Sequence, residues 1–231
     1  MSILKQHKKI FSLIQVELEK LGFTEFSYRP HNYLFDAKKN IGEITYLLSF
    51  HLTSKSISLS YVYGDIMINP VNKILNQFIP DLSDNNERVT LTNHENGGNL
   101  EDFKKINEHL KSNDTSVYIA AIIEHIKKVD LPFFAQYPTI ETINQEIINK
   151  VPENDYADYI HSEKNFKVLI IMKLCNNPKY DNFKKWALDT YNKAIKEDFD
   201  LYKNDFNNLN TLLTLLDSGN YLKIIESDHI V

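Results

Sequence analysis

Hydrophobic residues change their spacing near residue 65 of this 231-residue chain. Before that point, two runs alternate apolar with polar positions, which is typical of strands that bury one face. The first run is Ile44, Tyr46, Leu48, Phe50 and Leu52, and the second is Ile57, Leu59, Tyr61 and Tyr63. We expect an antiparallel hairpin with Phe50 opposite Leu59, because this register places both apolar sets on one face. The polar positions between them would then face water.

Helical spacing stands on both sides of these strands. A helix over about residues 3–21 is predicted by its apolar positions, which are Ile10, Leu13, Ile14, Leu18 and Leu21. We expect Leu13 and Leu18 to pack on the apolar face of the sheet. Two shorter aromatic strands are predicted between residues 23 and 35. Further helices are predicted over about residues 71–78, 100–110, 117–128, 139–150, 154–162, 165–176, 180–197 and 204–218.

These elements predict an α+β protein. An N-terminal helix packs on an antiparallel meander of about four strands, and an all-helical C-terminal region follows. Leu131-Pro132 should stop the preceding helix, because a residue before proline avoids the helical conformation. We therefore expect an α+β domain over residues 1–130 and a helical-hairpin region over residues 131–231, packed on the first. The polar residues 81–99 predict a long mobile loop, in which Val89 and Leu91 are candidates for an edge strand.

Charge and composition narrow the classes of function. A net charge of −5 argues against nucleic acid as a partner, because phosphate binding needs a concentrated basic surface. The single cysteine, Cys175, excludes an intramolecular disulfide and fits a reducing compartment. No stretch approaches the roughly 20 apolar residues of a membrane span, and the N-terminal helix lacks the apolar core of a secretion signal. We expect a cytoplasmic protein, and the heavy use of Lys, Asn and Ile is typical of an AT-rich bacterial genome.

The residues that carry chemistry do not form a catalytic pattern. No two of the eight histidines stand three to five positions apart, so we expect no metal site. Cys175 lies among helical apolar positions, which favours a core thiol over a nucleophile. The only Gly-Gly pair, Gly97-Gly98, is not followed by the Lys of a phosphate loop, so we expect no nucleotide cofactor. We predict no catalytic and no cofactor-binding residue.

A binding surface is the remaining candidate for a functional site. His31, Asp36, His51 and Ser58 are expected on the polar face of the sheet and its turns. Trp186 is a candidate contact residue on the C-terminal helices, because aromatic residues are enriched in protein interfaces. Its helical spacing from Phe183 favours a buried position instead.

Several segments together resemble known bacterial proteins. They are the helix ending at Leu21-Gly22-Phe23, the aromatic strands after it, the Leu131-Pro132-Phe133-Phe134 element and the helical-hairpin tail. In this order they resemble a bacterial family of unknown function with a small α+β N-terminal domain. The pattern also resembles the immunity proteins of bacterial competition systems, which are cytoplasmic, acidic and without catalytic residues. This resemblance implies the fold and nothing about the chemistry, and no site residue comes from it.

Two functions remain open. We expect a non-enzymatic cytoplasmic protein that binds another protein, with an immunity-type factor as the form that the resemblance implies. A partner with a basic surface is favoured by the acidic charge. The alternative is an enzyme or a small-ligand-binding protein with a pocket between the sheet and the C-terminal helices.

Overall fold

The computed structural model describes residues 2–79, 88–93, 100–111 and 114–227. The chain divides into two compact units. The first comprises Met1–Met67 and Leu91–Pro138, and the second comprises Ile68–Thr90 and Thr139–Val231. The sequence-based division at residue 130 differs from these units in residues 68–90 and 131–138. Most of the segment predicted as a mobile loop lies outside the described residues.

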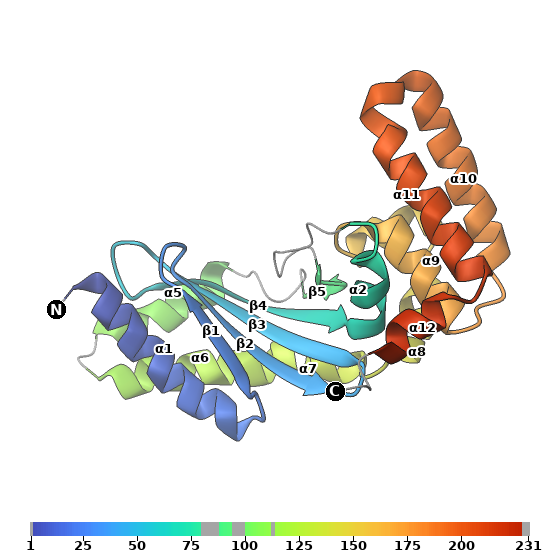
Figure 1. Ribbon diagram of the computed structural model, residues 1–231. Coiled ribbons are helices and arrows are strands. Elements are labelled where there is room, and N and C mark those ends of the chain that lie inside the picture. Colours follow the sequence, from blue (N-terminus) through green and yellow to red (C-terminus); the bar gives the residue numbers. More distant parts are fainter. Residues whose placement is uncertain (1, 80–87, 94–99, 112–113, 228–231) are drawn as a thin grey trace. The chain divides into compact units, whose positions relative to one another are not determined.

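The first unit is a helix-covered antiparallel sheet (Figure 1), so the predicted α+β fold is confirmed. Its five strands follow one another in the order β1-β2-β3-β4-β5. The predicted meander of about four strands is β1–β4, and the candidate strand at Leu91 is the short β5, which pairs with β4. The elements are α1 (Ile3–Lys20), β1 (Glu25–Arg29), β2 (Leu34–Ile41), β3 (Ile44–Leu52), β4 (Leu59–Ile68), β5 (Leu91–Thr92), α5 (Leu100–Glu108), η1 (His109–Lys111), α6 (Thr115–Lys128) and α7 (Asp130–Gln136).

Helices α1, α6 and α7 cover one face of this sheet (Figure 1). Phe11 of α1 stacks on Phe35 with ring centroids 4.9 Å apart, and Phe134 of α7 stacks on Tyr46 at 4.6 Å. Phe50 is fully buried, as predicted. Leu18 is also buried, but Leu13 is 38% exposed, so its predicted packing on the sheet is wrong. The buried stripe of α1 is narrower than its apolar stripe.

The predicted register of β4 is also wrong. Val62 is fully buried, whereas Tyr61 and Tyr63 are only half-buried. The Tyr61 ring stacks on His51 at 5.0 Å, so Tyr61 lies on the face opposite Phe50. The cause is the turn before β4, where the Thr53 N–H donates to the Ser58 carbonyl and the strand begins only at Leu59. Leu59 and Val62 are both buried although three positions apart, so strict alternation breaks within this strand.

The second face of the sheet is not the wet surface that alternation predicts. Leu47 is fully buried there, and Thr45 and Asp36 expose only 4% and 1% of their surface. The face therefore combines buried polar groups with half-exposed ones such as Ser49.

Pro132 lies within a helix, and Leu131 before it is helical, so the expected effect of Leu131-Pro132 on the chain is wrong. Helix α6 ends at Lys128, as predicted, but α7 begins at Asp130 and contains Pro132 in its first turn. The first N–H groups of a helix have no partner within it, so proline loses nothing at such a position.

The second unit is helical in its described residues. Its elements are α2 (Asn69–Leu75), α8 (Ile140–Ile143), η2 (Asn144–Ile148), η3 (Glu153–Asp158), α9 (Lys164–Leu174), α10 (Tyr180–Glu197), α11 (Phe199–Asp217) and α12 (Tyr221–Glu226). Helices α9 and α10 have nearly the predicted bounds. Helix α11 begins five residues earlier than the predicted start at 204, because the Asp198 carboxylate accepts a hydrogen bond from the Leu201 N–H and caps it. Cys175, expected in the core, is half-buried at the C-cap of α9.

A buried lysine ties two distant segments of the second unit together. Lys167 of α9 is fully buried. Its ammonium donates to the carbonyl oxygens of Val89 and His161, at 2.5 and 2.7 Å, and to the Ser162 hydroxyl. The three donors of an ammonium group thus each meet an oxygen, which is the condition for burying it.

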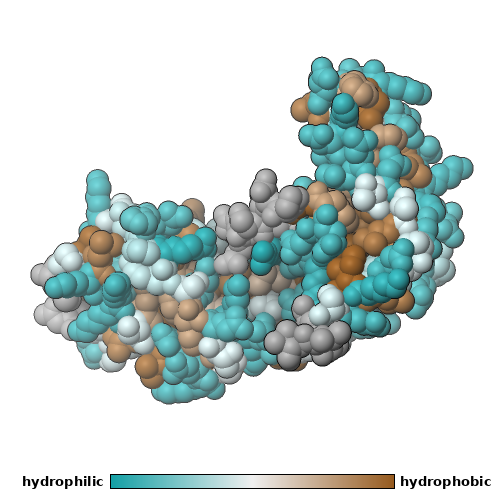
Figure 2. All heavy atoms as spheres, in the orientation of Figure 1, coloured by the Kyte–Doolittle hydropathy of each residue, from teal (hydrophilic) through white to brown (hydrophobic). Residues whose placement is uncertain are grey.

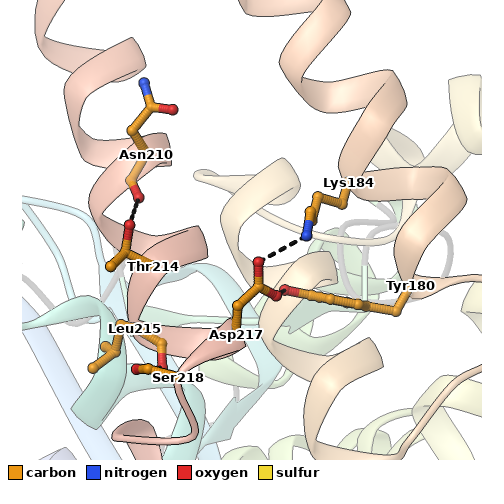
Figure 3. A network of polar contacts seen from close by, with 7 residues as sticks. All are labelled: Tyr180, Lys184, Asn210, Thr214, Leu215, Asp217 and Ser218. Atoms are coloured by element: carbon orange, nitrogen blue, oxygen red, sulfur yellow. Dashed lines mark hydrogen bonds and ion pairs between the residues drawn. The ribbon is translucent and has the colours of Figure 1, made fainter.

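Helices α10 and α11 form a hairpin held at its foot by polar contacts (Figure 3). The Tyr180 hydroxyl donates to one carboxylate oxygen of Asp217 at 3.0 Å, and the Lys184 ammonium donates to the other at 2.7 Å. Burial raises the pKa of Asp217, but the two hydrogen bonds together with the positive charges of Lys184 and Lys173 outweigh burial and hold the pKa below its usual value. None of the helices in the described residues combines the length and apolar character that a membrane span requires.

Candidate functional site

The structure brings four of the five predicted surface residues to one end of the sheet in the first unit. His31 lies in the turn between β1 and β2, and Ser58 lies in the turn between β3 and β4, so antiparallel order places both turns at the same end. Asp36 and His51 lie on one face near that end, opposite Ser49 and Leu34 in the ladder. Their exposure differs, since His31 is exposed, His51 and Ser58 are half-buried and Asp36 is buried.

Trp186 belongs to the other unit. It is half-buried in α10 and stacks on Phe183 with ring centroids 5.1 Å apart. It is neither the fully buried residue that its spacing favours nor a protruding one.

Asp36 is the centre of a polar cluster on the second face of the sheet. Its two carboxylate oxygens accept from the Arg29 guanidinium at 2.8 Å and from the Ser49 hydroxyl at 2.9 Å. The Arg29 side chain is 35% exposed and the Asp36 side chain only 1%. A buried carboxylate is stable when it is paired and hydrogen-bonded, and Asp36 meets both conditions.

An aromatic row lies beside this cluster. His51, Tyr61 and Tyr63 stack successively, with ring centroids 5.0 and 4.5 Å apart. Burial lowers the pKa of His51, against a hydrogen bond to the Asn32 backbone that raises it. Burial also raises the pKa of the Tyr61 phenol, and Tyr63 raises it further. Both rings are therefore neutral at pH 7, and the row offers hydrogen-bonding groups rather than charge.

The predictions from the sequence did not include two buried carboxyls, Asp65 in β4 and Asp130 at the start of α7. Asp65 exposes 6% of its surface and Asp130 none. Burial raises the pKa of each to about 7, against hydrogen bonds from Thr92 to Asp65 and from Asn93 and Gly64 to Asp130. A Cβ atom at position 64 would lie 2.6 Å from Oδ1 of Asp130, so only glycine admits this carboxyl. The signal in the sequence was Gly64-Asp65 within an otherwise apolar strand, where glycine often marks a close approach.

A groove between α1 and α6 is the second site that the sequence analysis missed. Its volume is about 470 Å³. Its apolar lining is Leu13, Val16, Ile119, Ala120 and Ile123, and its polar lining is Glu17, Ser116, Glu124 and Lys127. Leu13 and Val16 are 38% and 50% exposed. The signal was the width of the apolar stripe of α1, which exceeds what one sheet face covers.

The described residues offer no group of three His, Cys, Asp or Glu side chains arranged to hold a metal ion. Comparison of the chain with family models, with curated proteins and with solved structures finds no match.

Proposed function

We propose that this chain is a protein-binding protein and that the groove between α1 and α6 holds an amphipathic helix of its partner. The observation that carries the proposal is the groove itself, which leaves Leu13 and Val16 exposed between two neighbouring helices. Two helices side by side present a seam into which the ridge of a third helix fits. Covering this seam would remove apolar surface from water, and each Å² of apolar surface buried stabilises the complex by about 25 cal/mol.

Charge favours a basic partner. The groove carries Glu17 and Glu124 against Lys127, and the whole chain has a net charge of −5. Opposite charges on the two surfaces would speed association and orient the partner. The resemblance to immunity proteins makes a bacterial toxin the kind of partner that we expect.

Site-specific photo-crosslinking in the native host tests the groove. A benzophenone amino acid replaces Val16 in the groove, and the control carries it at Lys8, an exposed position elsewhere on α1. We expect one partner protein that crosslinks at position 16 and not at position 8. A second copy of this chain as the crosslinked species would contradict the proposal.

Affinity measurements with the purified partner complete the test. Val16→Asp places a charge in the groove and should weaken binding by about tenfold or more. Ser12→Asp adds the same charge at an exposed position of α1 that does not line the groove, and should change affinity by less than about twofold. Equal effects of the two substitutions would mean that the partner binds elsewhere.

A small-ligand function is the second candidate, and the polar sheet face favours it. Asp36, His51 and Tyr61 gather there, and His51 and Tyr61 have shifted pKa values, as groups in ligand sites often do. A thermal-shift screen with small polar metabolites separates the two functions. Stabilisation that Tyr61→Phe abolishes and Val16→Asp leaves intact would support the small-ligand function over protein binding.

A further inference from the structure

The tip of the α10–α11 hairpin, which we define as residues 192–208, contains no buried residue. It nevertheless carries five large apolar side chains, Ile195, Phe199, Leu201, Tyr202 and Phe206. Phe199 and Leu201 are 54% and 64% exposed. Figure 2 shows apolar side chains among polar ones at the end of this hairpin.

These side chains continue the stripes that are buried at the foot of the hairpin. In α11, Phe199, Tyr202 and Phe206 stand at helical spacing before the buried Leu209, Leu213 and Leu216. In α10, the buried positions are Tyr180, Phe183 and Ala187, and Ile195 lies two turns beyond them. Both α10 and α11 contact α9 in the second unit, so a third helix covers the foot. At the tip, the apolar side chains continue along the same helix faces, but none of them is buried.

The two helices also carry opposite charge. From Lys184 to Glu197, α10 has four lysines against two carboxylates. From Asp198 to Asp217, the α11 segment has four aspartates against one lysine. Only one close ion pair between the two helices is formed by the described residues, from Lys184 to Asp217 at the foot, so the tip retains charges available to a neighbour.

We propose that two copies of this chain pair through their hairpin tips about a twofold axis, with α10 of each copy against α11 of the other, in a four-helix bundle. A twofold interface uses the same patch on both copies, so the patch must complement itself. The hairpin tip meets this condition, because its basic helix faces the acidic helix of the second copy. The same rotation places the two apolar stripes in one core, as in other four-helix bundles.

Self-pairing also fits the charge of the whole molecule. Two copies with a net charge of −5 repel each other, so they associate only where the local charges are nearly balanced. The tip holds Lys193, Lys196 and Lys203 against the carboxylates of residues 197, 198, 200 and 205, and is close to neutral. Because the tip spans few helical turns, the interface is small and the dimer should dissociate on dilution.

Sedimentation of the full-length chain over a range of concentrations tests the proposal. We expect a reversible monomer–dimer equilibrium. Phe199→Asp should weaken dimerisation by about tenfold or more, and its exposure in the monomer means that the fold should survive. Val16→Asp, a matched change at a 50% exposed position of α1, should leave the dimer unchanged even though it should weaken binding in the groove.

A charge swap tests the pairing of α10 with α11. Variant A carries Lys193→Glu and Lys196→Glu, so both of its helices are acidic, and variant B carries Asp200→Lys and Asp205→Lys, so both are basic. Each variant alone should be monomeric, and an equimolar mixture should form an A–B dimer that salt weakens. Circular dichroism checks that the variants keep their helices.

Three outcomes would overturn the proposal. They are a monomeric chain at the highest concentration reached, a dimer that Phe199→Asp leaves intact, and folded variants A and B that do not associate. If the charge-swapped variants fail to fold, the first two measurements decide.

Discussion

The sheet of the first unit and the α10–α11 hairpin of the second differ in where they place apolar and polar side chains. In the first, the sheet assigns each strand residue to one of two faces, three helices cover one face, and carboxyls such as Asp36 and Asp65 are buried within or beside it. In the second, α10 and α11 run on past the helix that covers their foot, and Phe199 and Leu201 remain in water. A sheet strand that is covered on both faces buries its polar side chains along with its apolar ones. The two helices of the hairpin instead leave apolar side chains exposed where α9 does not cover them.

The largest expected difference between the units is the cost of removing an apolar side chain. Phe50→Ala should lower the free energy of unfolding by about 3–5 kcal/mol, because the ring is fully buried and leaves a cavity. Ile195→Ala in the hairpin tip should cost less than about 1 kcal/mol, because the side chain is already partly in water. Denaturant titration at concentrations that keep the chain monomeric measures both. Equal losses would show that the tip is packed as tightly as the sheet.

The buried carboxyls should make stability fall as pH rises. Asp65 and Asp130 bind protons more tightly when folded, since burial raises each pKa from 3.8 to about 7. Their contribution is fully present below pH 4 and is lost as pH rises to about 7. The loss should be on the order of 4 kcal/mol for each carboxyl, because each pKa rises by about three units and one unit corresponds to about 1.4 kcal/mol.

Asp130→Asn isolates this effect. The amide is neutral at every pH, so the variant should be more stable than the wild type near pH 8 by about 1–3 kcal/mol and should flatten the decline between pH 4 and 7. Glu124→Gln, at an exposed position on α6, should leave the decline unchanged. An unaltered pH profile in Asp130→Asn would remove these carboxyls as its cause.

The smallest expected effect is at the foot of the hairpin. Asp217→Asn breaks the charge pair with Lys184 but keeps an oxygen for the Tyr180 hydroxyl. The two charged side chains are 43% and 28% exposed, so the loss should be about 0.5–1 kcal/mol. Because the pKa of Asp217 is lowered when folded, this contribution is present above pH 4 and disappears as the carboxylate is protonated. A loss as large as that at Phe50 would mean that this network, rather than apolar packing, holds the hairpin.

The sequence alone determined most of the strands and the long helices. The alternation through Phe50 produced β3, and the helical spacing produced α1, α9 and α10 within a few residues of their observed ends. These features depend on neighbours within one or two turns or one strand, so local periodicity and caps contain the information. The candidates Asp36 and His51 were also correctly assigned to one face of the sheet, because strand alternation is local.

Tertiary structure alone decided how faces are covered. The six-residue turn before β4 turned Tyr61 toward His51, a change that no local pattern within the strand indicates. Leu13 faces a groove because α6 lies beside α1, and Asp130 is buried because Gly64 leaves room for it, in both cases through contacts between segments at least 60 residues apart in the chain. Periodicity indicates on which face of a helix or strand a residue lies. Whether that face is buried depends on which distant segment packs against it, and the packing of the whole unit decides this.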